Sequence, residues 1–359
     1  MQVYERPLDS IFTQLTLGPE REQISERYRY TLNPLTPSSA FPEHEREKIK
    51  FGEKEVLELL AQFKEELEYV DANSFDAVFT TLLSLLEKYL WCLPSATMNK
   101  GGELILADIS LYDHLKTTSA IAACLYKFHE HEIETYSQAN KYGYKLRLVG
   151  GEMSGIQNYL YKISAIGEGG VAKRLRSRSF YITALTEIII LHILDTFDLP
   201  LSCNLFSTGG KFLILVPNLK NEVVDVDIEM KAVERQIQAW LWENFNGEIH
   251  LTLDWQEDKM TGKDLNITRF HNVAERVYHN LASKEKQQLK SLFQNSGSWQ
   301  TNSFIRKIDL KNVSVESAPV FRLNFRSLML TIEWNVRKKI WKRNFVESAF
   351  LTKKLANDW

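Results

Sequence analysis

The sequence is poor in cysteine. Its 359 residues include three, Cys92, Cys124 and Cys203, and each stands alone among apolar neighbours. This isolation excludes a C-x-x-C metal or redox motif and predicts three reduced, buried thiols. No internal repeat or low-complexity tract is present either, so a solenoid or a disordered linker protein is excluded.

Long apolar runs and a large net charge are missing as well. The longest apolar run, Ile188–Ile193, is far too short to span a bilayer, and no basic-then-apolar leader opens the sequence. A cytosolic protein without a membrane partner is therefore expected. The net charge of −2 predicts no general attraction to nucleic acid, although residues 301–359 hold 12 Lys or Arg against 5 Asp or Glu.

The chain is long enough for about two or three compact units. Residues 1–144 read as a mostly helical domain, because apolar residues recur at helical spacing after a loop rich in proline and serine. The expected helices are 53–69, 75–92 and 108–127, and the loop is 33–42. In the last part we expect a linker at 258–264, a helix at 267–293, strand-like pieces at 320–330 and a basic aromatic run at 334–345.

The segment between these parts carries the most informative pattern of the chain. It reads strand, helix, strand, tight hairpin, strand, helix, strand, which is the split βαβ order of a ferredoxin-like sheet. The expected strands are 145–151, 203–207, 211–216 and 249–254, and the expected long helices are 185–199 and 224–245. The fold class is therefore α+β: a helical domain, a ferredoxin-like βαββαβ domain similar to palm and RNA-recognition modules, and a helical or irregular C-terminal segment.

Local signals mark two turns in this domain. The first strand is expected to end at the glycine pair Gly150-Gly151, with Ser154 as the N-cap of a helix over Gly155–Tyr161. The second turn is Thr208-Gly209-Gly210, where glycines can take the positive φ of a tight hairpin. Ile249–Asp254 alternates as a half-exposed strand should.

A palm that transfers nucleotides needs carboxylates at the end of its first strand and in its central hairpin, because Mg²⁺ takes hard oxygen ligands. Here the strand end offers only Glu152, and the hairpin offers Lys211 in place of an aspartate. The sequence therefore predicts a palm without two-metal chemistry of its own. Such a palm can still hold a nucleotide.

Three groups of residues are candidates for that nucleotide site. Ser154, Gly155 and Gln157 open a helix after a strand, where free N–H groups suit a phosphate, although a cap without a ligand is the simpler interpretation. Gly209, Gly210 and Lys211 form a hairpin expected on the same side. The third group is four cations within six residues: Lys173, Arg174, Arg176 and Arg178. Guanidinium groups match phosphate oxygens, whereas a solvated basic helix start is the usual explanation.

Histidines suggest no metal site. Asp113-His114 and His129-x-His131 lack an accompanying carboxylate set, and surface positions at helix ends are their usual explanation. Trp334 and Trp341 alternate with Arg337, Lys338, Lys339 and Lys342, which suits a nucleic-acid clamp and equally an amphipathic element with its aromatic side covered.

Three segments together resemble the large polymerase-like subunit of type III CRISPR effector complexes, in its Csm-type branch. They cover roughly residues 1–300 and follow the family's order. The segments are Arg6–Phe12 with Pro34-Leu35 and Phe41-Pro42; Asp108–Thr118; and Gly151–Gln157 with Ala172–Phe180 and Gly209–Phe212. The resemblance implies a partial HD-derived helical domain over 1–144, a first palm over 145–257, and a helical linker with a degenerate zinc-region-like basic tail over 258–359.

Departures from the family are as informative as the matches. The chain has no His-Asp dipeptide for the nuclease centre and no Gly-Gly-Asp-Asp hairpin for the polymerase centre, and Ser317–Phe321 has no cysteine pair where the family often binds zinc. The resemblance thus implies half of a large subunit, from a split or shortened gene, that is not catalytic alone and holds no zinc.

The function implied by the resemblance is a contribution to ATP binding and cyclic oligoadenylate synthesis, with Mg²⁺ supplied at the second palm of a partner chain. The implied partners are the other subunits of an RNA-guided antiviral complex and its guide RNA. Two alternatives stay open: a purely structural subunit that caps the guide-RNA end without binding a nucleotide, and a degenerate fragment that folds without a function.

Overall fold

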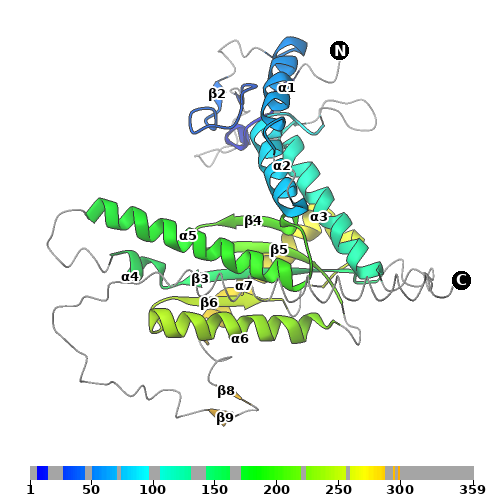
Figure 1. The fold of residues 1–359 in the computed structure, drawn as a ribbon. Helices are drawn as coiled ribbons and strands as arrows, with labels where there is room; N and C mark the ends of the chain where they lie inside the picture. The colour runs from blue at the N-terminus through cyan, green and yellow to red at the C-terminus, as the bar shows by residue number, and fades with distance from the viewer. Residues whose placement is uncertain are drawn as a thin grey trace, which may run out of the picture.

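A computed structural model describes residues 6–14, 27–44, 51–70, 74–96, 106–130, 143–161, 171–219, 224–255, 259–287, 294–295 and 298–299. The expectations for His131, Gly167–Gly170, Ser317–Phe321, the strand-like pieces at 320–330 and the tryptophan-rich run at 334–345 lie outside the described residues. Within them the chain is a mixed α+β protein built on one central sheet, as the sequence predicts (Figure 1).

Four main strands form the central sheet, in the order β4-β5-β3-β6, and all bonded neighbours are antiparallel. The strands are β3 (Leu146–Ser154), β4 (Asn204–Thr208), β5 (Lys211–Pro217) and β6 (His250–Asp254). Helix α5 (Val171–Thr196) connects β3 to β4, and α6 (Val226–Phe245) connects β5 to β6. A short helix, α4 (Ile156–Tyr161), follows β3, and a 3-10 turn, η3 (Leu201–Cys203), precedes β4.

Strand β3 lies at the centre and runs on through its glycine pair to Ser154. The prediction that the strand ends at Gly151 is therefore wrong. The physical reason is close packing on both faces: a Cβ at Gly151 would lie 2.0 Å from Phe212 Cζ, and one at Gly150 would lie 2.2 Å from Val277 Cγ1. The glycines admit neighbours from both sides of the sheet rather than making a turn.

Helices cover both faces of the sheet. On one face Ser207 Oγ donates to Glu187 Oε1 of α5 at 3.0 Å, and the buried Arg147 Nη1 donates to Asp227 Oδ1 of α6 at 2.6 Å. On the other face lies α7 (Ile267–Glu285), whose Val277 meets Gly150. In Figure 1, α5 and α6 lie in front of the strands and α7 behind them. Because helices pack on both faces of the sheet, β6 is almost wholly buried. The half-exposed strand predicted from its alternation is therefore wrong.

The N-terminal part is a separate layer of helices and short strands. It contains η1 (Ile11–Gln14), β1 (Tyr28–Arg29), β2 (Glu43–His44), α1 (Glu53–Leu67), α2 (Phe75–Leu90) and α3 (Leu111–His129). Its small core gathers around Leu59, Tyr89 and Cys92. The buried Asp9 carboxylate ties its loops together, because it accepts from Arg29 Nε at 3.0 Å and from the Ala107 amide at 3.3 Å.

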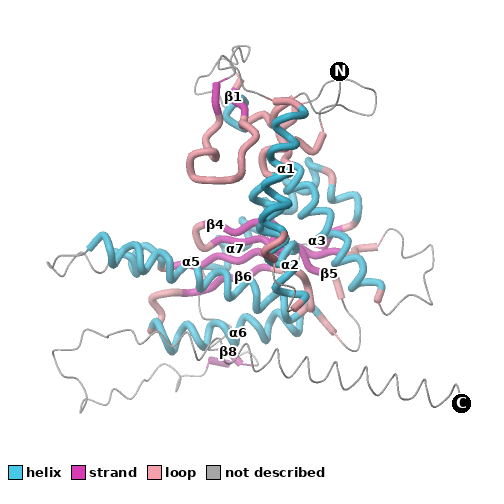
Figure 2. Tube along the Cα trace, turned by 45° about the horizontal axis from the view of Figure 1, so that its top comes forward, coloured by secondary structure: helices cyan, strands magenta, loops and turns pink. Residues whose placement is uncertain are grey.

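Helix α3 joins this layer to the sheet. Its Ala120 and Cys124 are fully buried in the same core as the strands. In Figure 1, α1 and α2 lie above the sheet and α3 runs down to it, and in Figure 2, with the top turned forward, α2 overlaps the strands. All three cysteines are free and buried, as predicted, but they are not all isolated: Cys124 Sγ lies 3.9 Å from Cys203 Sγ. The neighbouring thiol and burial both raise the pKa of the Cys124 thiol, so Cys124 contributes to packing rather than to thiolate chemistry.

Two further elements differ from the sequence expectation. Residues 258–264, expected as a linker, include β7 (Lys259–Met260), which pairs with the start of β3, and lead into η4 (Gly262–Leu265), capped by Thr261 and Asp264. Helix α5 begins at Val171, well before the predicted start at residue 185. Its first turns were missed because they are exposed and lack apolar periodicity.

Among the described helices, α5 alone has the length and composition of a membrane span. Packing accounts for the apolar residues of its second half that face the sheet, since Leu185, Ile189, Ile190 and Ile193 are all buried in the core of the sheet. The described residues also include a two-stranded antiparallel sheet of β8 (Gln294–Asn295) and β9 (Ser298–Trp299).

Candidate nucleotide-binding corner

The end of β3, the start of α4 and the β4–β5 hairpin meet at one corner of the sheet. The Met153 amide donates to Gly210 O at 2.8 Å, outside the regular ladder. A Cβ at Gly210 would lie 2.6 Å from Ile156 Cδ1, and both hairpin glycines have positive φ, +57° at Gly209 and +86° at Gly210. The hairpin and the strand–helix turn are therefore side by side, as the sequence predicts.

Gly155 makes the sharp turn from β3 into α4. Its φ is +86°, a Cβ there would lie 1.9 Å from Glu248 O, and its carbonyl accepts the first helical hydrogen bond, from the Tyr159 amide at 3.0 Å. A side chain at this position would be excluded on both counts. Gln157 is exposed on the first turn of α4.

Ser154 does not cap α4, so that prediction is wrong. It is the last residue of β3, pairs with His250, and its hydroxyl donates to Glu285 Oε1 of α7 at 2.8 Å. The pleat of the strand directs its side chain to the α7 face of the sheet, away from the helix that follows. What reaches the corner from this residue is its backbone.

Lys211 has a partner on the neighbouring strand. It lies directly opposite Glu152, and its Nζ is 3.0 Å from Glu152 Oε1, while 47% of the lysine side chain stays exposed. An ion pair this accessible is worth at most about 1 kcal/mol, so an incoming phosphate can compete with it. The only carboxylate at the corner that the sequence offered to a metal is thus bound to a cation.

The four clustered cations take different positions. Arg178 lies against α4, where its guanidinium stacks 4.7 Å from the Tyr159 ring centroid and Nη1 donates to Tyr159 O. Lys173, Arg174 and Arg176 are exposed on the first turns of α5, which extend past the ends of the strands (Figure 1). Only Arg178 is held beside the corner.

A charged cluster at the β6 edge was missed by sequence reasoning. The buried Asp254 carboxylate meets Lys284 Nζ at 2.6 Å and accepts from Asn280 Nδ2 at 3.0 Å, both from α7. Nearby on α6, burial raises the pKa of Glu234 to about 7, and the charge of Lys284 opposes this rise. The signal available in the sequence was Asp254, an acidic residue at the end of a predicted strand.

The histidine motifs have structural partners. Asp113 accepts from Ser110 Oγ at 2.8 Å at the start of α3, and His129 Nε2 lies 3.0 Å from Lys145 Nζ. Across the described ranges, no group of three or more His, Cys, Asp or Glu side chains is arranged to hold a metal ion.

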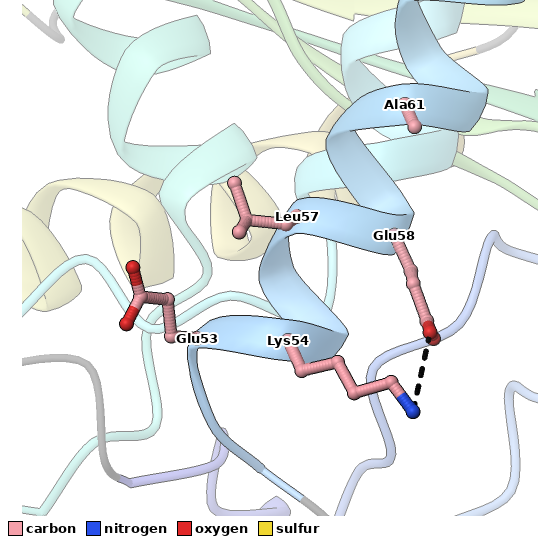
Figure 3. Close-up of a pocket in the computed structure, with 5 residues that line it drawn as sticks. All are labelled: Glu53, Lys54, Leu57, Glu58 and Ala61. Carbon is pink, nitrogen blue, oxygen red and sulfur yellow. Dashed lines mark ion pairs between the residues drawn. The ribbon is translucent and has the colours of Figure 1, made fainter.

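A pocket of about 570 Å³ lies elsewhere, on α1. Figure 3 shows that all five lining residues come from this one helix: Glu53, Lys54, Leu57, Glu58 and Ala61. Lys54 and Glu58 form an exposed ion pair of 3.7 Å. The pocket is open, and it contains none of the residues that the sequence singled out.

Comparison with known proteins gives the corner its context. Residues 145–303 match the family model described as Csm1 subunit domain B. The chain is 30% identical over 274 residues to the CRISPR system single-strand-specific deoxyribonuclease Cas10/Csm1 (subtype III-A) of Methanocaldococcus jannaschii, covering 69% of this chain and 32% of that protein. It is 28% identical over 296 residues to the protein of the same name from Thermococcus onnurineus, covering 78% and 36%.

The fold is similar to that of solved Csm1 structures. In a Csm1–Csm4 cassette in complex with one ATP, the matched chain gives a TM-score of 0.59 at 25% identity, over 80% of this chain and 35% of that one. The present chain thus spans about a third of the length of the relatives that it matches.

Proposed function

The chain is related to the Cas10/Csm1 subunits of subtype III-A CRISPR systems, and from this relation we propose that it is a subunit of a type III RNA-guided antiviral effector complex. Its partners are then the other subunits of that complex, including a Csm4-type neighbour as in the related cassette, and the guide RNA. Such a complex acts in the cytoplasm.

Within this proposal, residues 145–257 are a ferredoxin-like first palm. The strand order β4-β5-β3-β6, with α5 and α6 as the two crossovers, supports this assignment. Residues 1–144 are then the helical domain related to HD nucleases, and residues 258–359 the linker and basic tail. Helix α3 belongs to the helical domain by sequence, and it packs on the sheet of the palm.

The palm is proposed to hold ATP without catalysing nucleotide transfer. The observation that carries this is the ion pair of Glu152 with Lys211, at the place where two-metal chemistry needs free carboxylates. Mg²⁺ and its ligands are then supplied by a second palm on a partner chain, and cyclic oligoadenylate synthesis takes place between the two. The related structure with bound ATP supports a nucleotide ligand.

Each corner residue has a definite task in this proposal. The backbone at Ser154, Gly155 and Gln157 faces the nucleotide, and Gly209 and Gly210 let the hairpin approach it closely. Lys211 exchanges Glu152 for a phosphate oxygen on the α7 face of the sheet, whereas Arg178, held by Tyr159, offers a cation on the face covered by α5 and α6.

The proposal is tested by titrating the full chain with fluorescent ATP, alone and with a polypeptide carrying the second palm. We expect tight binding only in the mixture, and about tenfold weaker binding after Lys211→Ala, the loss of one charge-assisted contact. Lys54→Ala on α1 removes a cation from another exposed ion pair, outside the corner, and is the matched control. Absence of ATP binding in both settings contradicts the composite site.

A second candidate function is a structural subunit that caps the guide-RNA end and binds no nucleotide. It is favoured by the same ion pair, because Lys211 is already neutralised by Glu152. Under this alternative the chain enters the complex with guide RNA normally. Addition of ATP and the substitution Lys211→Ala both leave this assembly unchanged.

A further inference from the structure

We propose that one face of α1 binds a basic amphipathic helix of another polypeptide. The face, here called the α1 seam, consists of Leu57, Leu60, Lys64 and Leu67, and all four side chains are exposed. In Figure 1, α1 lies above the sheet, away from the corner formed by β3, α4 and the β4–β5 hairpin. The seam is therefore separate from the proposed ATP site and does not depend on it.

The spacing of the seam is that of a helix-pairing surface. Its members follow one another after three, four and three residues, as do the a and d positions of a coiled coil. Lys64 is the polar member, and a lysine at such a position fixes the register of a helix pair. Leu59, which is buried in the small core with Tyr89 and Cys92, lies roughly a third of the way around the helix from the seam. Helix α1 thus has two apolar faces, and the fold covers the one that carries Leu59.

The leucines of the seam leave much apolar surface in water. The exposed fraction is 55% for Leu57, 41% for Leu60 and 39% for Leu67. Single exposed leucines are common on soluble proteins, but three at this spacing form one apolar stripe along a helix. Covering the stripe removes this surface from water, which favours association with a partner that has an apolar stripe of its own.

A hollow beside the seam suits an elongated partner. The pocket of about 570 Å³ on α1 has Leu57 and Ala61 as its apolar lining, and Glu53 and the Lys54–Glu58 ion pair as its charged lining (Figure 3). A small molecule needs a site that encloses most of its surface, which a single helix does not provide. A second helix laid along α1 can place a side chain in the hollow and follow the seam toward Leu67.

The charge around the seam selects a basic partner. Residues 53–68 contain six glutamates and two lysines. Glu66 is paired with Lys88 of α2, whereas Glu53, Glu65 and Glu68 make no ion pair within the described part of the chain. Glutamates that flank an apolar seam attract lysine or arginine at the flanking positions of a partner helix. A second copy of the same seam would bring glutamates against glutamates, which disfavours self-association.

The test uses the full chain and fluorescence anisotropy with a labelled peptide of three heptads that has leucine at a and d and lysine at e and g. A peptide with glutamate in place of lysine tests charge, and a scrambled peptide of the same composition tests spacing. Leu57→Ser with Leu60→Ser disrupts the seam. Ile109→Ser with Leu115→Ser is the matched control, because these side chains are 54% and 42% exposed and lie outside α1. Thermal melts verify that each variant is folded.

We expect the basic peptide to bind, and the acidic and scrambled peptides to bind at least tenfold more weakly. Leu57→Ser with Leu60→Ser weakens binding of the basic peptide at least tenfold, as for contacts at the centre of an interface. The Ile109 and Leu115 control leaves binding unchanged.

The glutamates are tested by association kinetics. Glu65→Gln with Glu68→Gln slows association of the basic peptide and reduces the salt dependence of the association rate, because charges at the rim of an interface act mainly on this rate. Glu243→Gln with Glu275→Gln removes two exposed carboxylates from α6 and α7 and leaves the rate and its salt dependence unchanged.

A crosslinker at Ala61 identifies what covers the seam. Ala61→Cys is labelled with a benzophenone maleimide, which is selective because the three natural cysteines are buried. Illumination of the labelled chain with the basic peptide should join the two. A crosslink to a second copy, or to residues 301–359 of the same chain, would instead assign the seam to the chain itself and overturn the proposal.

Three further results overturn the proposal: no binding of the basic peptide, equal binding of the acidic or scrambled peptide, or equal loss in the Ile109 and Leu115 control. Lys211→Ala separates the seam from the corner. Unchanged peptide binding by this variant supports a separate surface, whatever the fate of the proposed ATP site. Loss of peptide binding in a folded Lys211→Ala variant would place the peptide at the corner and contradict the proposal.

Discussion

At the scale of single residues, Glu234 gives the chain a predicted pH dependence. Burial raises the pKa of its carboxyl to about 7, from 4.5. Because the unfolded chain ionises first as the pH rises, the folded state loses stability between pH 4.5 and 7, and the loss is complete above pH 7. Its size is at most about 3 kcal/mol, from the shift of the pKa.

Glu234→Gln should remove this loss. The variant is expected to be more stable than the natural chain at pH 8 by up to about 3 kcal/mol, and equal to it near pH 4. Urea unfolding at both values measures the difference. Glu65→Gln on α1, which removes an exposed carboxylate, serves as the control. If Glu234→Gln changes the free energy of unfolding equally at the two pH values, the pKa of the Glu234 carboxyl is not raised by folding.

At the scale of elements, β3 depends on its glycines for packing. Phe212 covers Gly151 so closely that three of its ring atoms lie 2.0 to 2.4 Å from a Cβ placed there. Gly151→Ala should therefore destabilise the protein by more than about 3 kcal/mol, measured by urea unfolding, because the ring has no room to move in a dense core. Gly262→Ala, with nothing within 4 Å, is the harmless counterpart.

A second substitution distinguishes overpacking from backbone strain. Phe212→Leu shortens the group that covers Gly151 and should restore part of the stability lost in Gly151→Ala, although it costs stability by itself. If the double variant is no better than the sum of the two single ones, the clash with Phe212 is not the cause.

The sequence indicated the hairpin and α6 to within about two residues, since turn glycines and an apolar face are local signals. It missed the first turns of α5, because an exposed helix end bearing Lys173 and Arg176 has no apolar period. It also missed the ion pair of Lys211 with Glu152 and that of Lys284 with Asp254. These contacts depend on strand register and on α7, which no local pattern encodes.

At the scale of the whole molecule, α3 couples the helical layer to the sheet. Ala120 and Cys124 of α3 lie in the core of the sheet. At the start of the same helix, the Leu111 amide donates to Leu93 O, just past the end of α2. A helix shared by two layers transmits the opening of one to the other. The two parts should therefore unfold together in spite of their separate small and large cores.

Ala120→Leu tests this coupling. Ala120 is 0% exposed, and three added carbons in a filled core should lower the free energy of unfolding by about 1–3 kcal/mol. The rate of amide hydrogen exchange, measured by mass spectrometry, should then rise in α2 as well as in β5, because α3 can no longer pack closely against the strands. Ala122→Leu adds the same three carbons at an exposed position of α3 and should leave exchange unchanged. Faster exchange confined to β5 would mean that the helical layer holds together without the sheet.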